Sequence, residues 1–158
     1  MTQEDEKKLN EIEDSNFLVS IMLANSECGT LQPVEKIAKL VHQKGGLIHC
    51  DIVQAVGKIE VDLEKLNVDF ATISAHKLNG PQGVGALLAR KGLEISPLIF
   101  GGGQEKSKRA GTTNVAGIAG FGEACKIAKT KPQKYKEVEK LRNYLEEEIL
   151  KDLKIMSC

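Results

Sequence analysis

The sequence of 158 residues contains no tryptophan, and Phe, Trp and Tyr together make up only 4% of it. Its hydrophobic core must therefore be built mainly from aliphatic side chains. The chain also lacks a surplus charge of either sign, because 22 Lys and Arg residues balance 22 Asp and Glu residues. Proteins that bind nucleic acid through its phosphates usually carry a basic surplus, so this balance argues against a general nucleic-acid binder.

Long hydrophobic runs are missing as well. The longest run, at residues 17–24, is interrupted by Ser20 and is far shorter than the roughly 18 residues that a membrane span requires. The first residues, MTQEDEKK, are acidic and polar, unlike a signal peptide. We therefore expect no membrane partner and a cytoplasmic location.

The cysteines are few and widely spaced. None of them forms a CxxC pair, and the chain contains only Cys28, Cys50, Cys125 and Cys158. In a reducing compartment this spacing predicts free thiols rather than a disulfide framework or a zinc site. We expect no metal site.

The hydrophobic pattern predicts strands that alternate with helices. Strands are expected at 17–24, 47–51, 70–74 and 84–90, with a short fifth strand at 98–100. Helices are expected from Pro33 to the Gly45–Gly46 pair, over 114–129, and from Pro132 onward, with a helical turn at 61–66. The glycine-rich segment 101–112 predicts a loop. This alternation is typical of an α/β fold with a mainly parallel sheet flanked by helices.

We divide the chain into a polar lead-in at 1–16, a large-domain portion at 17–130 and a C-terminal helix at 131–158. The last helix has one apolar stripe, formed by Tyr135, Val138, Leu141, Leu145 and Ile149. The helix at 114–129 is rich in small residues. Each interior glycine costs a helix about 1 kcal/mol relative to alanine, so we expect another backbone to pack closely against this helix.

Polar side chains follow three of the predicted strands, where ligands of parallel sheets bind. Asn25, Asp51 and the stretch Ser74–Lys77 hold these positions. Desolvation and the adjacent His76 would favour the neutral, nucleophilic form of Lys77, which a Schiff base with a carbonyl cofactor requires. Asp51 would then pair with a protonated pyridine nitrogen. Taken alone, Lys77 is more typical of a solvated loop lysine, and Asp51 is equally typical of a turn.

Four segments occur in a distinctive order and spacing: LVSIMLANSECGTLQP, HCDIVQAVGK, SAHKLNGPQGVGALL and GGGQEKSKRAGTTNV. Together they resemble the large domain of NifS/IscS-type cysteine desulfurases, which are pyridoxal-phosphate enzymes of fold type I in the class-V aminotransferase family. The resemblance extends from Phe17 to Lys129. It implies that the sheet is part of the large domain of such a transferase.

The resemblance also implies how the residues around the pyridine ring act. Lys77 would form the Schiff base with pyridoxal 5′-phosphate, and Asp51 would pair with the ring nitrogen. Gln54 and Asn25 would contact the phenolic oxygen of the ring.

Three further residues would bind the phosphate of the cofactor. Ser74 and His76 would hold it within one subunit. Thr112, at the end of the glycine-rich loop, would reach the phosphate of the neighbouring subunit, which implies a homodimer.

Some positions depart from the family pattern, namely Ser26, Asn79, Gln82 and Lys106. The chain resembles only a central piece of a longer polypeptide, so the histidine that stacks on the ring and the cysteine nucleophile are expected in segments that are not present. His42 is predicted to be an exposed helix residue, and His49 a core or structural hydrogen-bonding residue. None of the four cysteines is predicted to replace the nucleophile.

The resemblance implies a cysteine desulfurase, in truncated form. It would remove sulfur from L-cysteine, giving L-alanine and an enzyme persulfide for iron–sulfur cluster assembly or other sulfur transfer, with a sulfur-accepting scaffold protein as a candidate partner. Whether this chain is itself an enzyme is left open. The alternatives are a non-catalytic remnant or association module, and a selenocysteine lyase or aminotransferase of the same family.

Overall fold

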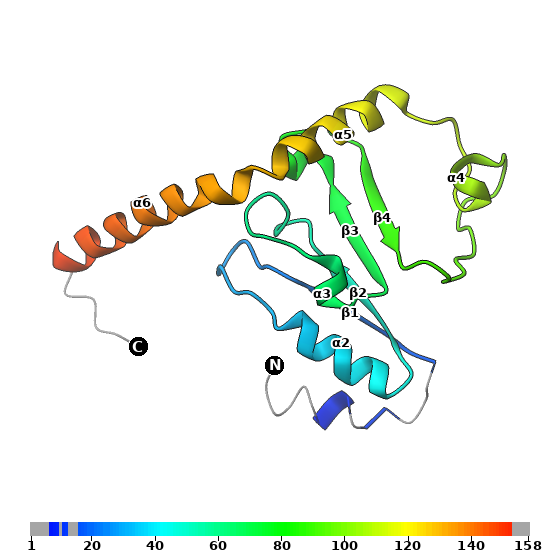
Figure 1. Cartoon of the computed structure of the whole chain (residues 1–158), viewed down its shortest axis with the longest axis horizontal. Helices are drawn as coiled ribbons and strands as arrows, with labels where there is room; N and C mark the ends of the chain where they lie inside the picture. The colour runs from blue at the N-terminus through cyan, green and yellow to red at the C-terminus, as the bar shows by residue number, and fades with distance from the viewer. Residues whose placement is uncertain (1–6, 10, 13–15, 153–158) are drawn as a thin grey trace.

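The computed structural model describes residues 7–9, 11–12 and 16–152, and a four-stranded sheet lies at its centre (Figure 1). The strands are β1 (Leu18–Met22), β2 (Leu47–Asp51), β3 (Phe70–Ser74) and β4 (Gly85–Ala89), in that spatial order. The first three run parallel, and β4 pairs antiparallel with β3. The prediction of a mainly parallel sheet flanked by helices is confirmed.

Two helices pack on one face of this sheet. Helix α2 (Val34–Gln43) begins after Pro33 and buries Val34, Ile37, Ala38 and Val41. Helix α3 (Leu63–Leu66) is a single turn, and Asp62 caps it by accepting hydrogen bonds from the backbone N–H groups of Glu64 and Lys65. Together they cover the strand residues that form the main hydrophobic core.

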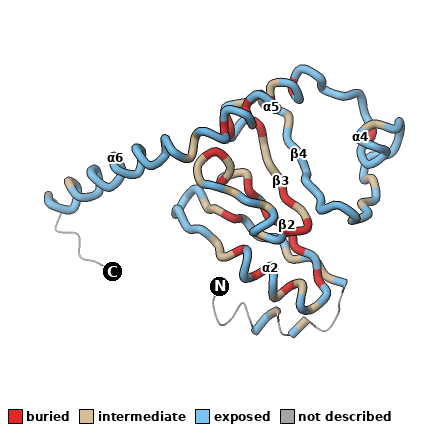
Figure 2. The backbone as a smooth tube through the Cα atoms, viewed as in Figure 1, coloured by how far each residue is buried: buried red, intermediate tan, exposed pale blue. Residues whose placement is uncertain are grey.

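The two faces of the sheet differ in burial, as Figure 2 shows by its alternating colours along the strands. Ile48 and Cys50 on β2 are fully buried beneath α2. Leu18, Leu47 and Leu87 point to the opposite face, and their exposed fractions are 57%, 36% and 55%. Parallel sheets are normally covered on both faces. In this chain one face stays open to solvent.

Helix α5 (Val115–Ala128) packs closely against the segment that follows β3. That segment begins with the short 3₁₀ helix η1 (Ala75–Leu78). A Cβ atom added at Gly120 would lie 2.6 Å from Cγ of Pro81, and one at Gly80 would lie 3.0 Å from Cβ of Ala124. The small residues therefore permit the close approach that the sequence predicted.

Helix α6 (Lys131–Asp152) continues from α5 and projects away from the sheet (Figure 1). Its apolar stripe is exposed to solvent throughout: Tyr135, Val138, Leu141, Leu145 and Ile149. No helix within the described ranges is both long enough and apolar enough to cross a membrane.

Two predicted elements differ from the structure. Strand β1 is shorter than the predicted run 17–24. The short strand expected at 98–100 is wrong: Leu98 and Phe100 lie in an exposed loop, and the carbonyl of Ile99 accepts a hydrogen bond from the N–H of Ala110, across the loop. Among the residues that the structure describes, no strand lies beside these three apolar residues for them to pair with.

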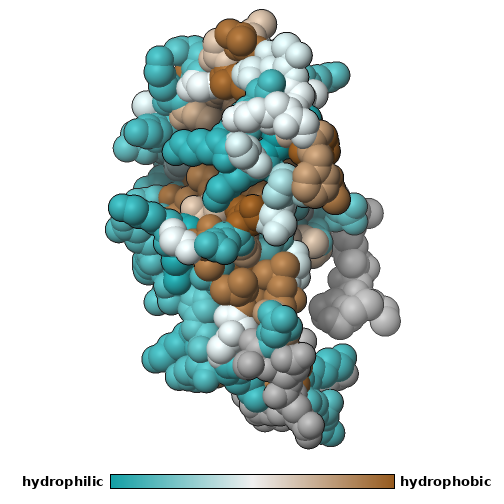
Figure 3. Space-filling model, turned by 90° about the vertical axis from the view of Figure 1, so that its right-hand side faces the viewer, coloured by the Kyte–Doolittle hydropathy of each residue, from teal (hydrophilic) through white to brown (hydrophobic). Residues whose placement is uncertain are grey.

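The glycine-rich segment is a loop, as predicted, but it contains a short turn, α4 (Gln104–Ser107). Its residues Glu105, Lys106 and Ser107 have φ angles of 48°, 57° and 62°. This left-handed turn projects beyond β4 (Figure 1). Figure 3, seen from that side, shows hydrophobic surface exposed among hydrophilic side chains.

Candidate functional site

The sheet brings three of the predicted polar segments to one edge. Met22 pairs with Asp51, and Asp51 pairs with Thr72, so the carboxyl ends of the three parallel strands are nearly level. Asn25 follows β1, Asp51 ends β2, and Ser74 ends β3 directly before η1. The parallel register thus gathers side chains that are up to 52 positions apart in the sequence, from Asn25 to Lys77.

Asn25 after β1 and Asp51 at the end of β2 each accept hydrogen bonds from the backbone of their own turn. Asp51 is exposed, and its Oδ1 accepts a hydrogen bond of 2.9 Å from the N–H of Val53. Asn25 is half-buried, and its Oδ1 accepts hydrogen bonds from the N–H groups of Glu27 and Cys28. Because the oxygen of Asn25 is used in this turn, its amide nitrogen is the atom left to face a ligand.

After β3, the polar residues lie on η1 and the residue before it. Ser74 Oγ and His76 Nδ1 are hydrogen-bonded at 2.8 Å. Ala75 and Leu78 are buried, which turns His76 and Lys77 to the exposed side of η1. The desolvation expected for Lys77 is therefore not found in this chain. Asn79 ends η1 with a φ of 64°, a conformation that asparagine tolerates better than most residues.

Lys58, which no sequence motif marks as a site residue, lies in the turn after β2 and within range of the charge of Lys77 on η1. Its Nζ donates a hydrogen bond of 2.5 Å to Oε1 of Gln54. Burial lowers the pKa of Lys58, and the positive charge of Lys77 lowers this pKa further. Lys58, Gln54 and Lys77 therefore form one cluster. The signal in the sequence was a lysine four residues after Gln54, a spacing that brings side chains together in helical turns.

Thr112 is exposed and lies outside this cluster. The segment between α4 and α5, which contains it, is well apart from η1 in Figure 1. This chain alone does not bring Thr112 to Lys77. The binding roles of all seven predicted residues stay predictions.

Two of the three histidines, His42 and His49, are held by structural hydrogen bonds. His49, on the middle strand β2, contacts Ser20 Oγ at 2.7 Å and Thr72 Oγ1 at 3.1 Å, which fits the structural role predicted for it. The prediction for His42 is wrong, because this residue is half-buried and its Nε2 donates to Oδ2 of Asp69 at 2.8 Å. Only the packing of α2 on the sheet places the two side chains together.

The thiols differ sharply in their surroundings. Cys50 is fully buried, and burial together with the neighbouring Asp51 raises its pKa to about 11. Burial also raises the pKa of Cys125. Cys28 is exposed, and hydrogen bonds from Thr30 lower its pKa. Cys158 lies outside the described residues.

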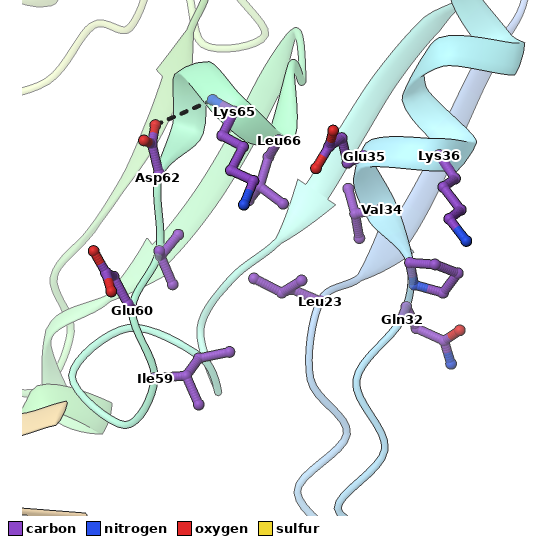
Figure 4. A pocket seen from close by; sticks show the side chains of 12 residues that line it. Leu23, Gln32, Val34, Glu35, Lys36, Ile59, Glu60, Asp62, Lys65 and Leu66 are labelled. Atoms are coloured by element: carbon purple, nitrogen blue, oxygen red, sulfur yellow. Dashed lines mark hydrogen bonds between the residues drawn. The ribbon is translucent and has the colours of Figure 1, made fainter.

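A cleft of about 610 Å³ opens elsewhere, between the start of α2 and the segment before α3 (Figure 4). Leu23, Val34 and Ile59 form its apolar part, and Glu60 and Lys65 lie at its rim. None of the predicted site residues lines it. Within the described part of the chain, no three His, Cys, Asp or Glu side chains are grouped so that they could hold a metal ion.

A mainly parallel sheet with an amine, a carboxylate and a hydroxyl–imidazole pair beyond its carboxyl ends defines an α/β domain whose polar side chains gather at the edge where ligands of such sheets usually bind. The sequence matches the aminotransferase class-V family over residues 2–157, and the chain belongs to this family.

Within the family, curated relatives of this chain are named cysteine desulfurases. The chain is 44% identical over 143 residues to "Cysteine desulfurase IscS" of Methanosarcina thermophila, a match that covers 90% of this chain and 35% of the relative. It thus spans about a third of the length of the curated relatives it matches.

Solved structures agree. A NifS-like protein from Rickettsia africae aligns with a TM-score of 0.87 and 42% identity, covering 92% of this chain and 41% of that one. A structure described as "SspA in complex with cysteine" aligns with a TM-score of 0.71 and 36% identity, covering 77% of this chain and 35% of that one. The resemblance to NifS/IscS-type enzymes and the fold-type I architecture are confirmed.

Proposed function

We propose that this chain is the cofactor-holding portion of a pyridoxal-phosphate-dependent cysteine desulfurase, which removes sulfur from L-cysteine and leaves L-alanine. The observation that carries the proposal is the cluster at the carboxyl edge of the sheet, where Asp51, Gln54 and Lys77 lie on neighbouring segments. The 44% identity over 143 residues to a protein named "Cysteine desulfurase IscS" supports the same reaction.

The chemistry of the side chains at this edge fits pyridoxal 5′-phosphate. The exposed carboxylate of Asp51 suits a protonated pyridine nitrogen, and the exposed amine of Lys77 suits attachment to a carbonyl carbon. Ser74 and His76, hydrogen-bonded to each other at 2.8 Å, offer a hydroxyl and an imidazole to a phosphate. The amides of Gln54 and Asn25 would face the phenolic oxygen.

When bound, the cofactor supplies an electron sink for the negative charge that develops at the α-carbon of the substrate. The residues of this chain would bind and orient the ring for this chemistry. Asp51, at the carboxyl end of β2, would offer its carboxylate to the protonated ring nitrogen. Asn25 and Gln54 lie on rigid turns after β1 and β2, so their amides orient the ring rather than follow it.

The thiol that receives sulfur must be a reactive thiolate on an accessible segment. Cys50 and Cys125 do not meet this requirement, because burial raises the pKa of each thiol. We therefore assign the persulfide to neither of them. A second copy of the chain would bring Thr112 to the phosphate group held by Ser74 and His76, and a cytoplasmic scaffold protein would accept the sulfur.

The proposal is tested by incubating the protein with pyridoxal 5′-phosphate, reducing it with borohydride and mapping the modified peptide. We expect a yellow protein that carries the label on Lys77. The Lys77→Ala variant should lose both colour and label, whereas Lys91→Ala, which removes an exposed lysine beyond β4, should keep them. A wild-type protein that remains unlabelled, or is labelled mainly elsewhere, would contradict the proposal.

Product analysis then identifies the substrate. Sulfide and alanine formed from L-cysteine in the presence of a reductant would support the desulfurase. Alanine formed only from selenocysteine would indicate a selenocysteine lyase instead, and amino-group transfer to a keto acid would indicate an aminotransferase.

An association module is a second candidate, favoured by the open face of the sheet. Leu18, Leu47 and Leu87 are exposed there, and the stripe on α6 is exposed as well. Exposed apolar surface of this kind is typical of a binding face. A chain that takes up no cofactor but binds a full-length relative in a pull-down would support this candidate over the enzyme.

A further inference from the structure

The turn after β2 is a rigid support for the side chains it carries. Ala55 and Val56 donate their N–H groups to the carbonyl of Ile52, and Lys58 and Ile59 donate theirs to Ala55. Ile52 and Ala55 are buried, with exposed fractions of 2% and 0%. The turn between Gln54 and Lys58 therefore has little freedom.

The same turn packs directly on η1 and α5. Gly57 has a φ of 77°, and a Cβ added to it would lie 3.3 Å from Cδ2 of Leu78 and 3.4 Å from Cβ of Ala128. Leu78 is the neighbour of Lys77 in η1. This close approach explains why Lys58 lies near enough to Lys77 to be affected by its charge.

The contact between Lys58 and Gln54 decides which way the amide of Gln54 is turned. A lysine ammonium has three donors and no acceptor, so the atom that faces it at 2.5 Å must be the oxygen Oε1. The NH₂ group of the same amide then points away from Lys58. A fixed amide of this kind can donate hydrogen bonds to a ligand but cannot accept them through that group.

We propose that Lys58 is a positioning residue, which holds the oxygen of Gln54 so that the amide NH₂ is presented to an oxyanion at the carboxyl edge of the sheet. The inference rests on the proposed function, in which that oxyanion is the phenolic oxygen of pyridoxal 5′-phosphate. A donor stabilises an oxyanion, whereas an amide turned the other way would set its own oxygen against it. Lys58 thus acts on the ligand through Gln54.

Two other lysines are relevant to a test of Lys58: Lys77 on η1, and Lys131, which is hydrogen-bonded to η1. Lys77 on η1 lowers the pKa of Lys58, and Nζ of Lys131 on α6 donates to the carbonyl of Leu78 at 3.2 Å. Lys131 is half-buried, and its hydrogen bond goes to η1 rather than to Gln54. The Lys131→Met variant is therefore a matched control, since it removes a nearby positive charge and leaves the contact between Lys58 and Gln54 in place.

The first test needs no cofactor. In NMR spectra of the protein alone, Lys58→Met should shift the side-chain amide signals of Gln54, and Lys131→Met should leave them nearly unchanged. Lys77→Met should raise the pH at which Lys58 titrates, because it removes a positive charge beside it. Gln54 signals that ignore Lys58→Met, or respond equally to Lys131→Met, would overturn the inference.

The second test uses pyridoxal 5′-phosphate itself. Lys58→Met should weaken cofactor binding about tenfold, the size expected when a charge-assisted hydrogen bond is lost. It should also move the colour change that reports ionisation of the phenolic oxygen to higher pH, while Lys58→Arg should restore both values. Circular dichroism confirms that each variant is folded.

The two failures are distinguishable. If the wild type takes no cofactor onto Lys77, the proposed function fails, and the NMR test still decides whether Lys58 orients Gln54. If the wild type binds the cofactor and Lys58→Met binds it equally well with the same colour change, the inference about Lys58 is wrong and the proposed function stands.

Discussion

The two ends of the sheet carry the same kinds of side chain but use them differently. At the amino end, Asp69 is only 4% exposed and accepts hydrogen bonds from Nε2 of His42 and from the N–H of Ile48, both at 2.8 Å. Arg90 lies 3.3 Å from its other oxygen and also donates to Asn67. At the carboxyl end, Asp51 is exposed, and its Oδ1 accepts a hydrogen bond from the N–H of Val53 in its own turn.

The difference teaches how to separate structural from functional polar residues in this fold. A buried carboxylate must be paired and hydrogen-bonded, or it would cost several kcal/mol. The amino end meets that demand with Asp69, which precedes β3, His42 of α2 and Arg90, which follows β4, so these polar groups bind one another. The carboxyl end keeps Asp51, His76 and Lys77 exposed, as a ligand-binding edge requires.

The sharpest way to test this comparison is to remove the carboxylate at each end. Asp69→Ala should lower the free energy of unfolding by about 3 kcal/mol, because it leaves His42, Arg90 and a buried N–H without their partner. Asp51→Ala should change stability by less than about 1 kcal/mol and should abolish retention of pyridoxal 5′-phosphate. Urea unfolding followed by circular dichroism measures the two stability changes, since the chain has no tryptophan for fluorescence. The absorbance of the protein-bound cofactor after desalting measures its retention.

Equal losses of stability at the two ends would contradict the division into a structural and a functional end. So would an Asp69→Ala variant that is as stable as the wild type.

A second, smaller effect is expected where α5 packs beside the carboxyl edge. Gly120→Ala should destabilise the protein by about 1–3 kcal/mol, because the new methyl group would meet the ring of Pro81. Gly122→Ala, on the same helix, meets nothing within 4 Å and should stabilise it by up to about 1 kcal/mol through helix propensity. Thermal unfolding of the two variants should therefore shift in opposite directions, and shifts in the same direction would argue against the close packing.

The smallest effect is a difference in thiol reactivity, which leaves stability unchanged. Cys28, in the exposed loop after β1, has a pKa below the ordinary 9.0, so its thiolate persists to lower pH. Cys50 on the covered face has a pKa of about 11. Iodoacetamide at neutral pH should modify Cys28 first, and Thr30→Val should slow this reaction by raising the pKa. Rapid labelling of Cys50 in the folded protein would show that the covered face opens.

Local sequence pattern predicted the regular elements well where the pattern is strong. The bounds predicted for the strands at 47–51 and 70–74 are those of β2 and β3, because each is a short apolar run with a polar residue at its end. The prediction failed at 98–100, where apolar residues form no strand. Strand formation needs a neighbour to pair with, and a neighbour cannot be read from a local pattern.

The candidate site was predictable in its members but not in its internal contacts. Asn25, Asp51 and Lys77 follow predicted strands, and a parallel sheet must gather such positions at one edge. Lys58 could not be predicted as a site residue, because its role depends on one hydrogen bond to Gln54 and on its proximity to Lys77, which only the folded chain sets. His42 was misjudged for a similar reason, since its partner Asp69 is 27 residues away.

The sequence by itself determined the alternation of strands and helices, the family and the residues that follow each strand, because these depend on local periodicity and on motifs of fixed spacing. Only the tertiary structure decided which charged groups are paired and which face solvent. Pairing depends on the packing of α2 and η1 against the sheet, which sets distances and dielectric surroundings between residues far apart in the chain. That packing makes Asp69 a structural residue and leaves Asp51 available to a ligand.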